Sequence, residues 1–357
     1  MCGKNRLILH VGLHKTGTSA IQKFLGKNIK NFQKIGVFVP FEPDYVPGEK
    51  NIHHYIPSLF KTYELNEIFN IFNKIVNDAR LYDQVVISSE VFNELSADLK
   101  IIQKVLSLFF NDIKVIIYIR RQDELSYSAY NQRVKRSNRT IKFNFEFLPF
   151  SLYLDYYVLL NKYSNLFGKD NIKVRVYNKS IHHSNNLIHD FFQSFNLTIP
   201  EGFNMLENGE LVNPSLGVKA LEFCRMLNYF VVGKTKRRFV ECLFNLPNEF
   251  ESDSIYLTPT DRNRILNLYS NSNKLVAKHY FNSEDEIFKM ENFDYNSNVN
   301  KFSVLDFLDE SQVYYIFNFI KNKDPELIDI LKFKVRETDP VIDQSSKDFV
   351  NILNKFY

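Results

Sequence analysis

The chain has 357 residues, of which 45% are hydrophobic and 24% are charged, and its formal net charge is +4. This composition excludes a disordered protein, and so small a positive charge does not favour nucleic acid as a partner. No apolar run approaches the roughly 20 residues of a membrane helix, and the first residues show no pattern of a secretory leader. The three cysteines, an odd number without the spacing of metal ligands, favour a reducing compartment. We therefore expect a cytoplasmic protein without a transmembrane segment.

Five short apolar runs in the first half of the chain have the pattern of strands that are buried on both faces. These runs are Arg6–Gly12, Gly36–Pro40, Gln84–Ser88, Lys114–Ile119 and Ile172–Tyr177. Between them lie stretches with a period of 3.6 residues, which predict helices at Thr18–Phe32, Tyr63–Ala79, Ser96–Phe110 and Asp123–Val134. This alternation implies an α/β fold with a parallel sheet and right-handed crossovers.

From about residue 200 onward the pattern of the sequence is helical. The predicted helices are Leu216–Tyr229, Thr260–Tyr280, Ser303–Lys321 and Asp348–Phe356. We expect residues 1–200 to form an α/β core and residues 201–300 to complete the same domain with helices. Residues 301–357 are expected to form a peripheral helical extension.

The stretch GLHKTGTS at Gly12–Ser19 follows the first predicted strand and leads into the first predicted helix. It is close to the nucleotide-binding pattern G-x-x-x-x-G-K-[ST], but Thr18 stands where that pattern has a lysine. Lys15 lies inside the loop instead, so its ammonium would reach over a shorter phosphate chain. A strand, a glycine-containing loop and a helix N-terminus together favour anion binding. The stretch therefore predicts a site for a nucleotide with one 5′-phosphate and a transferable group.

The segment HKTGTS resembles the 5′-phosphosulfate loop of sulfotransferases that use 3′-phosphoadenosine 5′-phosphosulfate (PAPS), in particular the bacterial, carbohydrate-type branch. The resemblance implies that Lys15 contacts the phosphosulfate bridge and stabilises the leaving phosphate, where negative charge develops. The loop residues that it implies for donor binding are His14, Lys15, Thr16, Gly17, Thr18 and Ser19.

A second match lies where the fourth predicted strand runs into a helix. In the sulfotransferase family an arginine at the end of that strand precedes a serine by eight residues, and Arg120 and Ser128 have this spacing. The resemblance implies that both bind the 3′-phosphate of PAPS, for which the planar fork of an arginine is suited. Weaker resemblance extends the match over roughly residues 6–282.

The base that removes the acceptor proton is expected at the end of the third predicted strand. The predicted strand runs into Ser89 and Glu90, and related sulfotransferases place a glutamate or histidine base there, so Glu90 is our first choice as the base; the alternative is a carboxylate that a helix N-terminus favours. His54, in the segment NIHHYIP, is an alternative base or an acceptor contact, or part of a surface pair without a role. A zinc site is rejected, because His10 and His14 belong to the strand and the loop.

The basic run Gly233–Arg238 is interpreted as a solvated charge cluster, with contact to the 3′-phosphate or to an acidic acceptor as the alternative. These features together predict a P-loop NTPase-like three-layer fold and a sulfotransferase that moves a sulfuryl group from PAPS to a carbohydrate or glycan-type acceptor. PAPS is a co-substrate here, adenosine 3′,5′-bisphosphate is the product, and no metal is required. Peripheral contact with a lipid-linked acceptor stays open. The alternatives are a P-loop kinase or NTPase acting on a small molecule and a non-catalytic nucleotide-binding protein.

Overall fold

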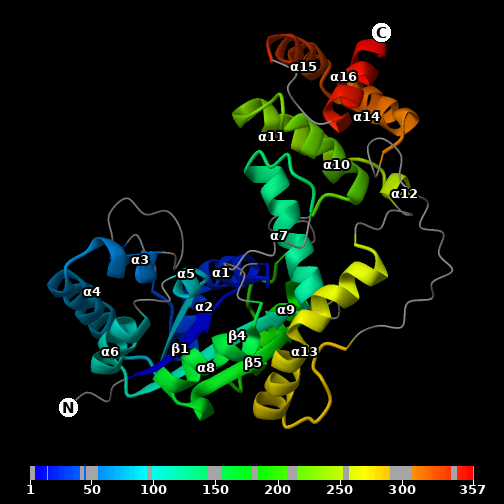
Figure 1. The fold of residues 1–357 in the computed structure, drawn as a ribbon. Coiled ribbons are helices and arrows are strands. Elements are labelled where there is room, and N and C mark those ends of the chain that lie inside the picture. Colours follow the sequence, from blue (N-terminus) through cyan, green and yellow to red (C-terminus); the bar gives the residue numbers. More distant parts are fainter. Residues whose placement is uncertain are drawn as a thin grey trace. The chain divides into compact units, whose positions relative to one another are not determined.

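The chain forms two compact units (Figure 1) in the computed structural model. The residues that the structure describes are 5–13, 15–40, 44–45, 55–94, 99–143, 154–178, 184–206, 215–251, 257–289, 308–338 and 344–356. The first unit comprises Met1–Leu125, Pro149–Asn213 and Leu266–Lys289; the second comprises Ser126–Leu148, Pro214–Ile265 and Met290–Tyr357. This division differs from the boundaries at residues 200 and 300 that the sequence suggested, because the chain passes between the two units several times.

The first unit is built on a five-stranded parallel sheet with the strand order β2-β3-β1-β4-β5. The strands are β1 (Arg6–Val11), β2 (Val37–Phe38), β3 (Gln84–Ser89), β4 (Asp112–Arg120) and β5 (Ile172–Tyr177). The central strand β1 pairs with β3 and β4, and its last residue Val11 lies opposite Ser89 and Ile117. All five predicted strands are present, and the predicted α/β fold with a central parallel sheet is confirmed.

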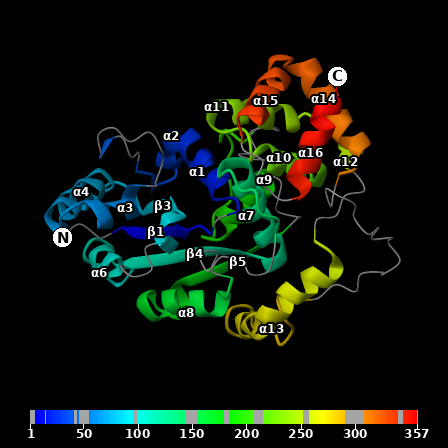
Figure 2. The ribbon, with the colours of Figure 1, turned by 45° about the horizontal axis from the view of Figure 1, so that its top comes forward.

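Helices cover both faces of the sheet, which gives three layers (Figure 2). On one face α1 (Thr18–Lys27), α2 (Ile29–Lys34) and α9 (Ser184–Gln193) pack on the sheet in one hydrophobic cluster. On the other face lie α4 (Leu65–Asp78), α6 (Leu99–Phe109) and α8 (Tyr156–Phe167). The remaining elements of the first unit are α3 (Tyr55–Thr62), α5 (Val91–Glu94) and η4 (Lys169–Asn171). The chain crosses between the units within α7 (Gln122–Arg136) and α13 (Pro259–Phe281).

The helix predicted over Thr18–Phe32 is interrupted at Asn28, so α1 and α2 are separate helices. Asn28 is buried, and its side-chain amide donates to the carbonyl oxygens of Phe24 and Asn204, both at 3.0 Å. Its Oδ1 accepts from the backbone N–H of Asn204 at 2.7 Å. These bonds hold the backbone of a distant segment and favour the non-helical conformation at Asn28, since asparagine competes with helical hydrogen bonding.

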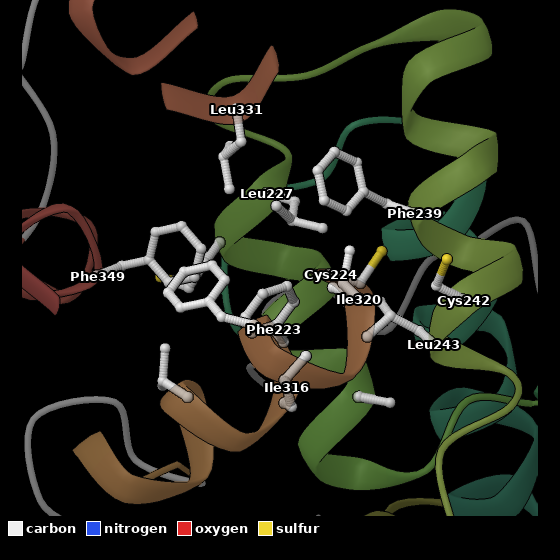
Figure 3. Packing of buried hydrophobic residues seen from close by; sticks show 14 of the residues in the cluster. Phe223, Cys224, Leu227, Phe239, Cys242, Leu243, Ile316, Ile320, Leu331 and Phe349 are labelled. Carbon is white, nitrogen blue, oxygen red and sulfur yellow. The ribbon is translucent and has the colours of Figure 1, made fainter. Parts of the chain in front are cut away.

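The described part of the second unit is helical and has its own core (Figure 3). Its helices are the later part of α7, the first turns of α13, and α10 (Val218–Leu227), α11 (Gly233–Leu243), α12 (Asn248–Glu251), α14 (Glu310–Lys323), α15 (Glu326–Glu337) and α16 (Gln344–Lys355). The helices after residue 300, expected as a peripheral extension, supply Ile316, Leu331 and Phe349 to this core. The core also holds Cys224 and Cys242, which are free thiols. Burial raises the pKa of the Cys224 thiol to about 12.

Buried side chains at the end of α10 and within α11 donate hydrogen bonds to a carbonyl group near the end of α7. The carbonyl of Val134 accepts from Nδ2 of Asn228 and from Nζ of Lys236, both at 2.9 Å, and Lys236 also donates to Oδ1 of Asn138 at 3.1 Å. A cation near a helix C-terminus is favoured by the helix dipole. The interpretation of Gly233–Arg238 as a solvated cluster is therefore wrong for Lys236, which is 3% exposed. Its burial lowers the pKa of the ammonium.

An ion pair with no solvent exposure lies beside this network. Nε of Arg225 donates to Oε2 of Glu222 at 2.9 Å, and both side chains are 0% exposed. Nη1 of Arg225 also donates to the carbonyl of Thr140 at 2.5 Å. The guanidinium thus replaces the water it loses on burial with a carboxylate and a carbonyl, which is the condition for burying a charge.

We expect Glu222→Gln to lower the free energy of unfolding by about 3–5 kcal/mol, because the Arg225 guanidinium stays buried without its counter-charge. The matched control is Lys334→Gln, which breaks an exposed pair with Glu337 that has the same i,i+3 spacing. Little change is expected there, since exposed pairs contribute little. Urea denaturation followed by circular dichroism measures both variants, and equal losses would contradict the prediction.

Candidate functional site

The first unit contains most of the residues that are predicted to bind PAPS. They lie at the carboxyl edge of its sheet. The loop of residues 12–17 follows β1 and leads into α1, and all of its residues except His14 are described. The N–H of Gly12 donates to the carbonyl of Ser89 at 3.2 Å, which joins the start of this loop to the end of β3. In open α/β sheets this edge is where ligands bind.

Two left-handed residues shape the 12–17 loop. Lys15 has φ 67° and Gly17 has φ 83°. This conformation costs a residue other than glycine about 1–2 kcal/mol, so the loop holds Lys15 against its intrinsic preference. The carbonyl of Leu13 closes the turn, since it accepts from the N–H of Thr16 at 3.3 Å and from Oγ1 of Thr16 at 2.7 Å. The lysine inside the loop is therefore held on a defined backbone.

Both glycines of the loop are required by their surroundings. A Cβ atom on Gly12 would lie 2.2 Å from Oγ1 of Thr18, and one on Gly17 would lie 2.4 Å from Cδ2 of Leu187 and 3.0 Å from Cε2 of Tyr177. Contacts under 3 Å are repulsive, so neither position accepts a side chain without movement of its neighbours. The glycine spacing that marks the motif in the sequence thus has a steric cause.

The N-terminus of α1 supplies backbone N–H groups that could donate hydrogen bonds to an anion. Gly17 is the N-cap, and no side chain of the described residues caps the helix. A helix N-terminus carries a partial positive charge of about half an elementary charge, and its first N–H groups have no partner within the helix. Ser19 is exposed in the first turn. The site thus combines this N-terminus with the cation of Lys15.

The hydroxyls of Thr16 and Thr18 take part in the internal structure of the loop. Both side chains are buried, and both hydroxyls donate to the carbonyl of Leu13, at 2.7 and 3.4 Å. The resemblance implies that Thr16 and Thr18 bind PAPS, but in this structure both hydroxyls are directed to Leu13. Their role as ligands stays a prediction that requires the side chains to turn.

Glu90 lies at the same edge, one residue beyond β3, and its side chain is partly exposed. Asn93 connects the turn that contains Glu90 to the 12–17 loop. Its N–H donates to the carbonyl of Glu90 at 3.3 Å, and its Nδ2 donates to the carbonyl of Gly12 at 2.7 Å. Tyr163 in turn donates to Oδ1 of Asn93 at 3.1 Å. Sequence reasoning missed Asn93, because only its buried position behind the loop reveals this connection.

Arg120 ends β4 and extends its side chain to the 12–17 loop. Its Nη1 donates to the carbonyl of Lys15 at 3.2 Å, and its Nε donates to Oε2 of Glu124 at 3.1 Å. The guanidinium also lies over the ring of Tyr177, 5.5 Å from the centroid. The backbone of Arg120 is held as well, because the hydroxyl of Tyr156 donates to its carbonyl. Arg120 is therefore fixed by contacts with the loop, with the first turn of α7, with β5 and with α8.

Tyr177 and Glu124 are site residues that the sequence reasoning did not identify. Tyr177 pairs in register with Arg120 across β4 and β5, and the same ring lies against Gly17. Burial raises the pKa of the Tyr177 phenol, an effect that the Arg120 cation opposes. An aromatic residue at the end of a buried strand was the available signal, but it is also the ordinary pattern of a core residue.

The other predicted site residues lie in the second unit or outside the described residues. Ser128 is buried on α7, within the second unit, so its pairing with Arg120 stays a prediction. His14 and His54 lie outside the described residues. Arg121, next to Arg120, forms a bidentate pair with Asp123 at 2.8 and 2.9 Å.

Within the described residues, no group of three or more His, Cys, Asp or Glu side chains is arranged to hold a metal ion. The helices of this part of the chain include none with the length and apolar character needed to cross a bilayer.

No family model matches the sequence, but individual proteins are similar to it. An uncharacterized protein of Archaeoglobus fulgidus is 27% identical over 207 residues, which are 57% of this chain and 55% of that protein, so the chain spans about half the length of this relative. Among solved structures, a sulfotransferase from Alicyclobacillus acidocaldarius is similar with a TM-score of 0.37 and 17% identity, over 57% of this chain and 87% of that one. A similarity of this size does not define the function of the chain.

We expect Gly12→Ala to lower the free energy of unfolding by about 1–3 kcal/mol, because the added methyl group must displace the Thr18 side chain. In the double variant Gly12→Ala/Thr18→Ala the two shortest contacts are removed and only Cβ of residue 18, at 2.9 Å, remains, so the loss should be smaller than the sum of the two single losses. Urea denaturation of the wild type and the three variants measures this coupling. Additive losses would show that the Thr18 side chain does not limit position 12.

Proposed function

We propose that the chain is a sulfotransferase that moves a sulfuryl group from PAPS to a hydroxyl of a carbohydrate or glycan-type acceptor. The observation that carries this proposal is which residues occupy the 12–17 loop and the first position of α1. Thr18, at the position where nucleoside triphosphatases have their lysine, is buried and donates to the carbonyl of Leu13, and the cation of the loop is Lys15. A cation in the middle of the loop suits a donor with a single 5′-phosphate better than it suits a triphosphate.

The residues at the sheet edge fit the donor that the sequence predicts. The 5′-phosphosulfate would lie on the 12–17 loop, where glycine at positions 12 and 17 keeps the backbone open and the N-terminus of α1 attracts negative charge. The 3′-phosphate would be bound by Arg120 and Ser128. A guanidinium has five N–H groups, and towards the described residues Arg120 donates through Nε to Glu124 and through Nη1 to Lys15, so Nη2 is suited to an anion.

The chemistry would be a direct transfer. The acceptor oxygen attacks sulfur, the bond between sulfur and the bridging oxygen breaks, and the electron pair stays on the 5′-phosphate of adenosine 3′,5′-bisphosphate. Lys15 would stabilise this developing charge. Glu90 would take the proton of the acceptor hydroxyl, with His54 as the alternative base. This scheme requires no metal, because the donor lacks the triphosphate that usually binds Mg²⁺.

The acceptor and the cellular setting are proposed on the sequence resemblance. A small molecule or a glycan precursor is the proposed partner, including a lipid-linked sugar reached by peripheral contact with a membrane. Nucleic acid is not proposed, because the formal net charge of the 357 residues is only +4. The proposed compartment is the cytoplasm.

We expect adenosine 3′,5′-bisphosphate to raise the melting temperature of the protein more than ATP with Mg²⁺ does. A ligand that binds the native state alone stabilises it by about 2.7 kcal/mol at a concentration of 100 times its Kd. Thermal-shift titrations with both ligands measure the effect. Stronger stabilisation by ATP with Mg²⁺ would instead indicate a P-loop kinase or NTPase.

We expect Lys15→Asn to lower the transfer rate by about 10²–10³-fold, because the developing phosphate charge loses its cation. Asparagine is chosen because it tolerates the left-handed backbone of this position. The control Lys27→Asn removes the same charge from the exposed end of α1 and should leave the rate unchanged. A single-turnover assay with radiolabelled PAPS measures all three proteins.

We expect Glu90→Gln to lower the transfer rate by about 10²–10⁴-fold while the Kd of adenosine 3′,5′-bisphosphate is unchanged, since the base acts on the acceptor and not on the donor. Calorimetric titration gives the Kd. An unchanged rate in Glu90→Gln together with a lost rate in His54→Ala would assign the base to His54.

A further inference from the structure

The family resemblance gives Arg120 a contact with the 3′-phosphate, yet its side chain is directed to the other end of the proposed donor site. Nη1 donates to the carbonyl oxygen of Lys15 at 3.2 Å, within the loop proposed to hold the 5′-phosphosulfate. The side chain is 14% exposed, so most of its surface lies against protein. A residue that served the 3′-phosphate alone would have no need of this bond.

The bond holds one of the two polar groups of a peptide in the 12–17 loop. The peptide between Lys15 and Thr16 has two polar groups: its N–H donates to the carbonyl of Leu13, and its C=O accepts from Arg120. The direction of this carbonyl is set by the ψ of Lys15, which together with the left-handed φ of 67° defines the backbone that carries the lysine side chain. Because left-handed lysine is disfavoured, a bond to the carbonyl stabilises this conformation.

The guanidinium itself is held in place by its neighbours. Glu124 accepts from Nε at 3.1 Å, and the Tyr177 ring supports the guanidinium at 5.5 Å. The same ring lies against Gly17, so a single aromatic side chain contacts both the arginine and the last residue of the loop. Arg120, Tyr177 and the 12–17 loop therefore form one packed assembly within the first unit.

We propose that Arg120 is a positioning residue of the 12–17 loop. It holds the Lys15 carbonyl, and through it the Lys15 cation, whether or not a 3′-phosphate is bound. The ligands of the test rest on the proposed function, but the bond itself does not. The consequence is that Arg120 also governs the binding of nucleotides that have no 3′-phosphate.

The test compares adenosine 5′-monophosphate, which lacks the 3′-phosphate, with adenosine 3′,5′-bisphosphate. The Kd of each is measured by calorimetric titration for the wild type, Arg120→Gln and Arg120→Lys. We expect both variants to bind the monophosphate about tenfold more weakly or worse, since each loses a charge-assisted hydrogen bond that shapes the loop. An unchanged monophosphate Kd beside weakened bisphosphate binding would overturn the proposal, because Arg120 would then serve the 3′-phosphate alone.

Arg6→Gln is the matched control. It removes the same charge from the opposite edge of the sheet, where Arg6 pairs with Asp112 at 2.6 Å, and should bind both nucleotides as the wild type does. If Arg6→Gln weakened monophosphate binding as much as Arg120→Gln, loss of positive charge alone would explain the result and the proposal would fail.

A measurement without ligand separates this inference from the proposed function. Hydrogen exchange of the Thr16 amide, which donates to Leu13, should be faster in Arg120→Gln than in the wild type and in Arg6→Gln. Equal exchange in all three would refute the positioning role. A wild type that binds neither nucleotide would refute the proposed function alone, since the exchange result would still show whether Arg120 holds the loop.

Discussion

The peptide between Lys15 and Thr16 is held at both of its polar groups, and the candidate site depends on this constraint. Leu13 accepts its N–H and Arg120 donates to its carbonyl. A lysine in a left-handed conformation would otherwise relax to a more favourable backbone. With the peptide fixed, the backbone of Lys15 is held just ahead of Gly17, the N-cap of α1, which no described side chain caps. A site of this kind favours negative charge through both a side chain and the helix dipole.

Parallel topology explains why residues far apart in the chain meet at this loop. Neighbouring parallel strands end at the same edge of the sheet, so the residues that follow or end β1, β3, β4 and β5 come together. Glu90 follows β3, Arg120 ends β4 and Tyr177 ends β5. The proposed transfer needs a base, a cation for the leaving group and a second anion site, and this edge brings candidates for these roles into one unit, with Ser128 as the exception.

The second unit shows how buried polar groups can fix a helix end. Asn228 and Lys236 satisfy the carbonyl of Val134, and the Arg225–Glu222 pair lies beside them without exposure to water. The buried charges of Arg225, Glu222 and Lys236 each have a partner, which burial requires. The first turn of α7, within the first unit, supplies Glu124 to Arg120, while the end of the same helix is held by this network. A single helix therefore takes part in both hydrogen-bond networks.

The sequence by itself determined the strands, the loop and the residue at the end of β4. Buried parallel strands are recognisable as continuous apolar runs, and the glycines at positions 12 and 17 mark a backbone that excludes side chains. Only the tertiary structure decided the helix break at Asn28, the burial of Lys236 and the direction of the Arg120 side chain. Each of these depends on a partner far away in the chain, such as Asn204, Val134 or Lys15. Local periodicity predicts which face of an element is buried, but it does not predict which distant residue contacts that face.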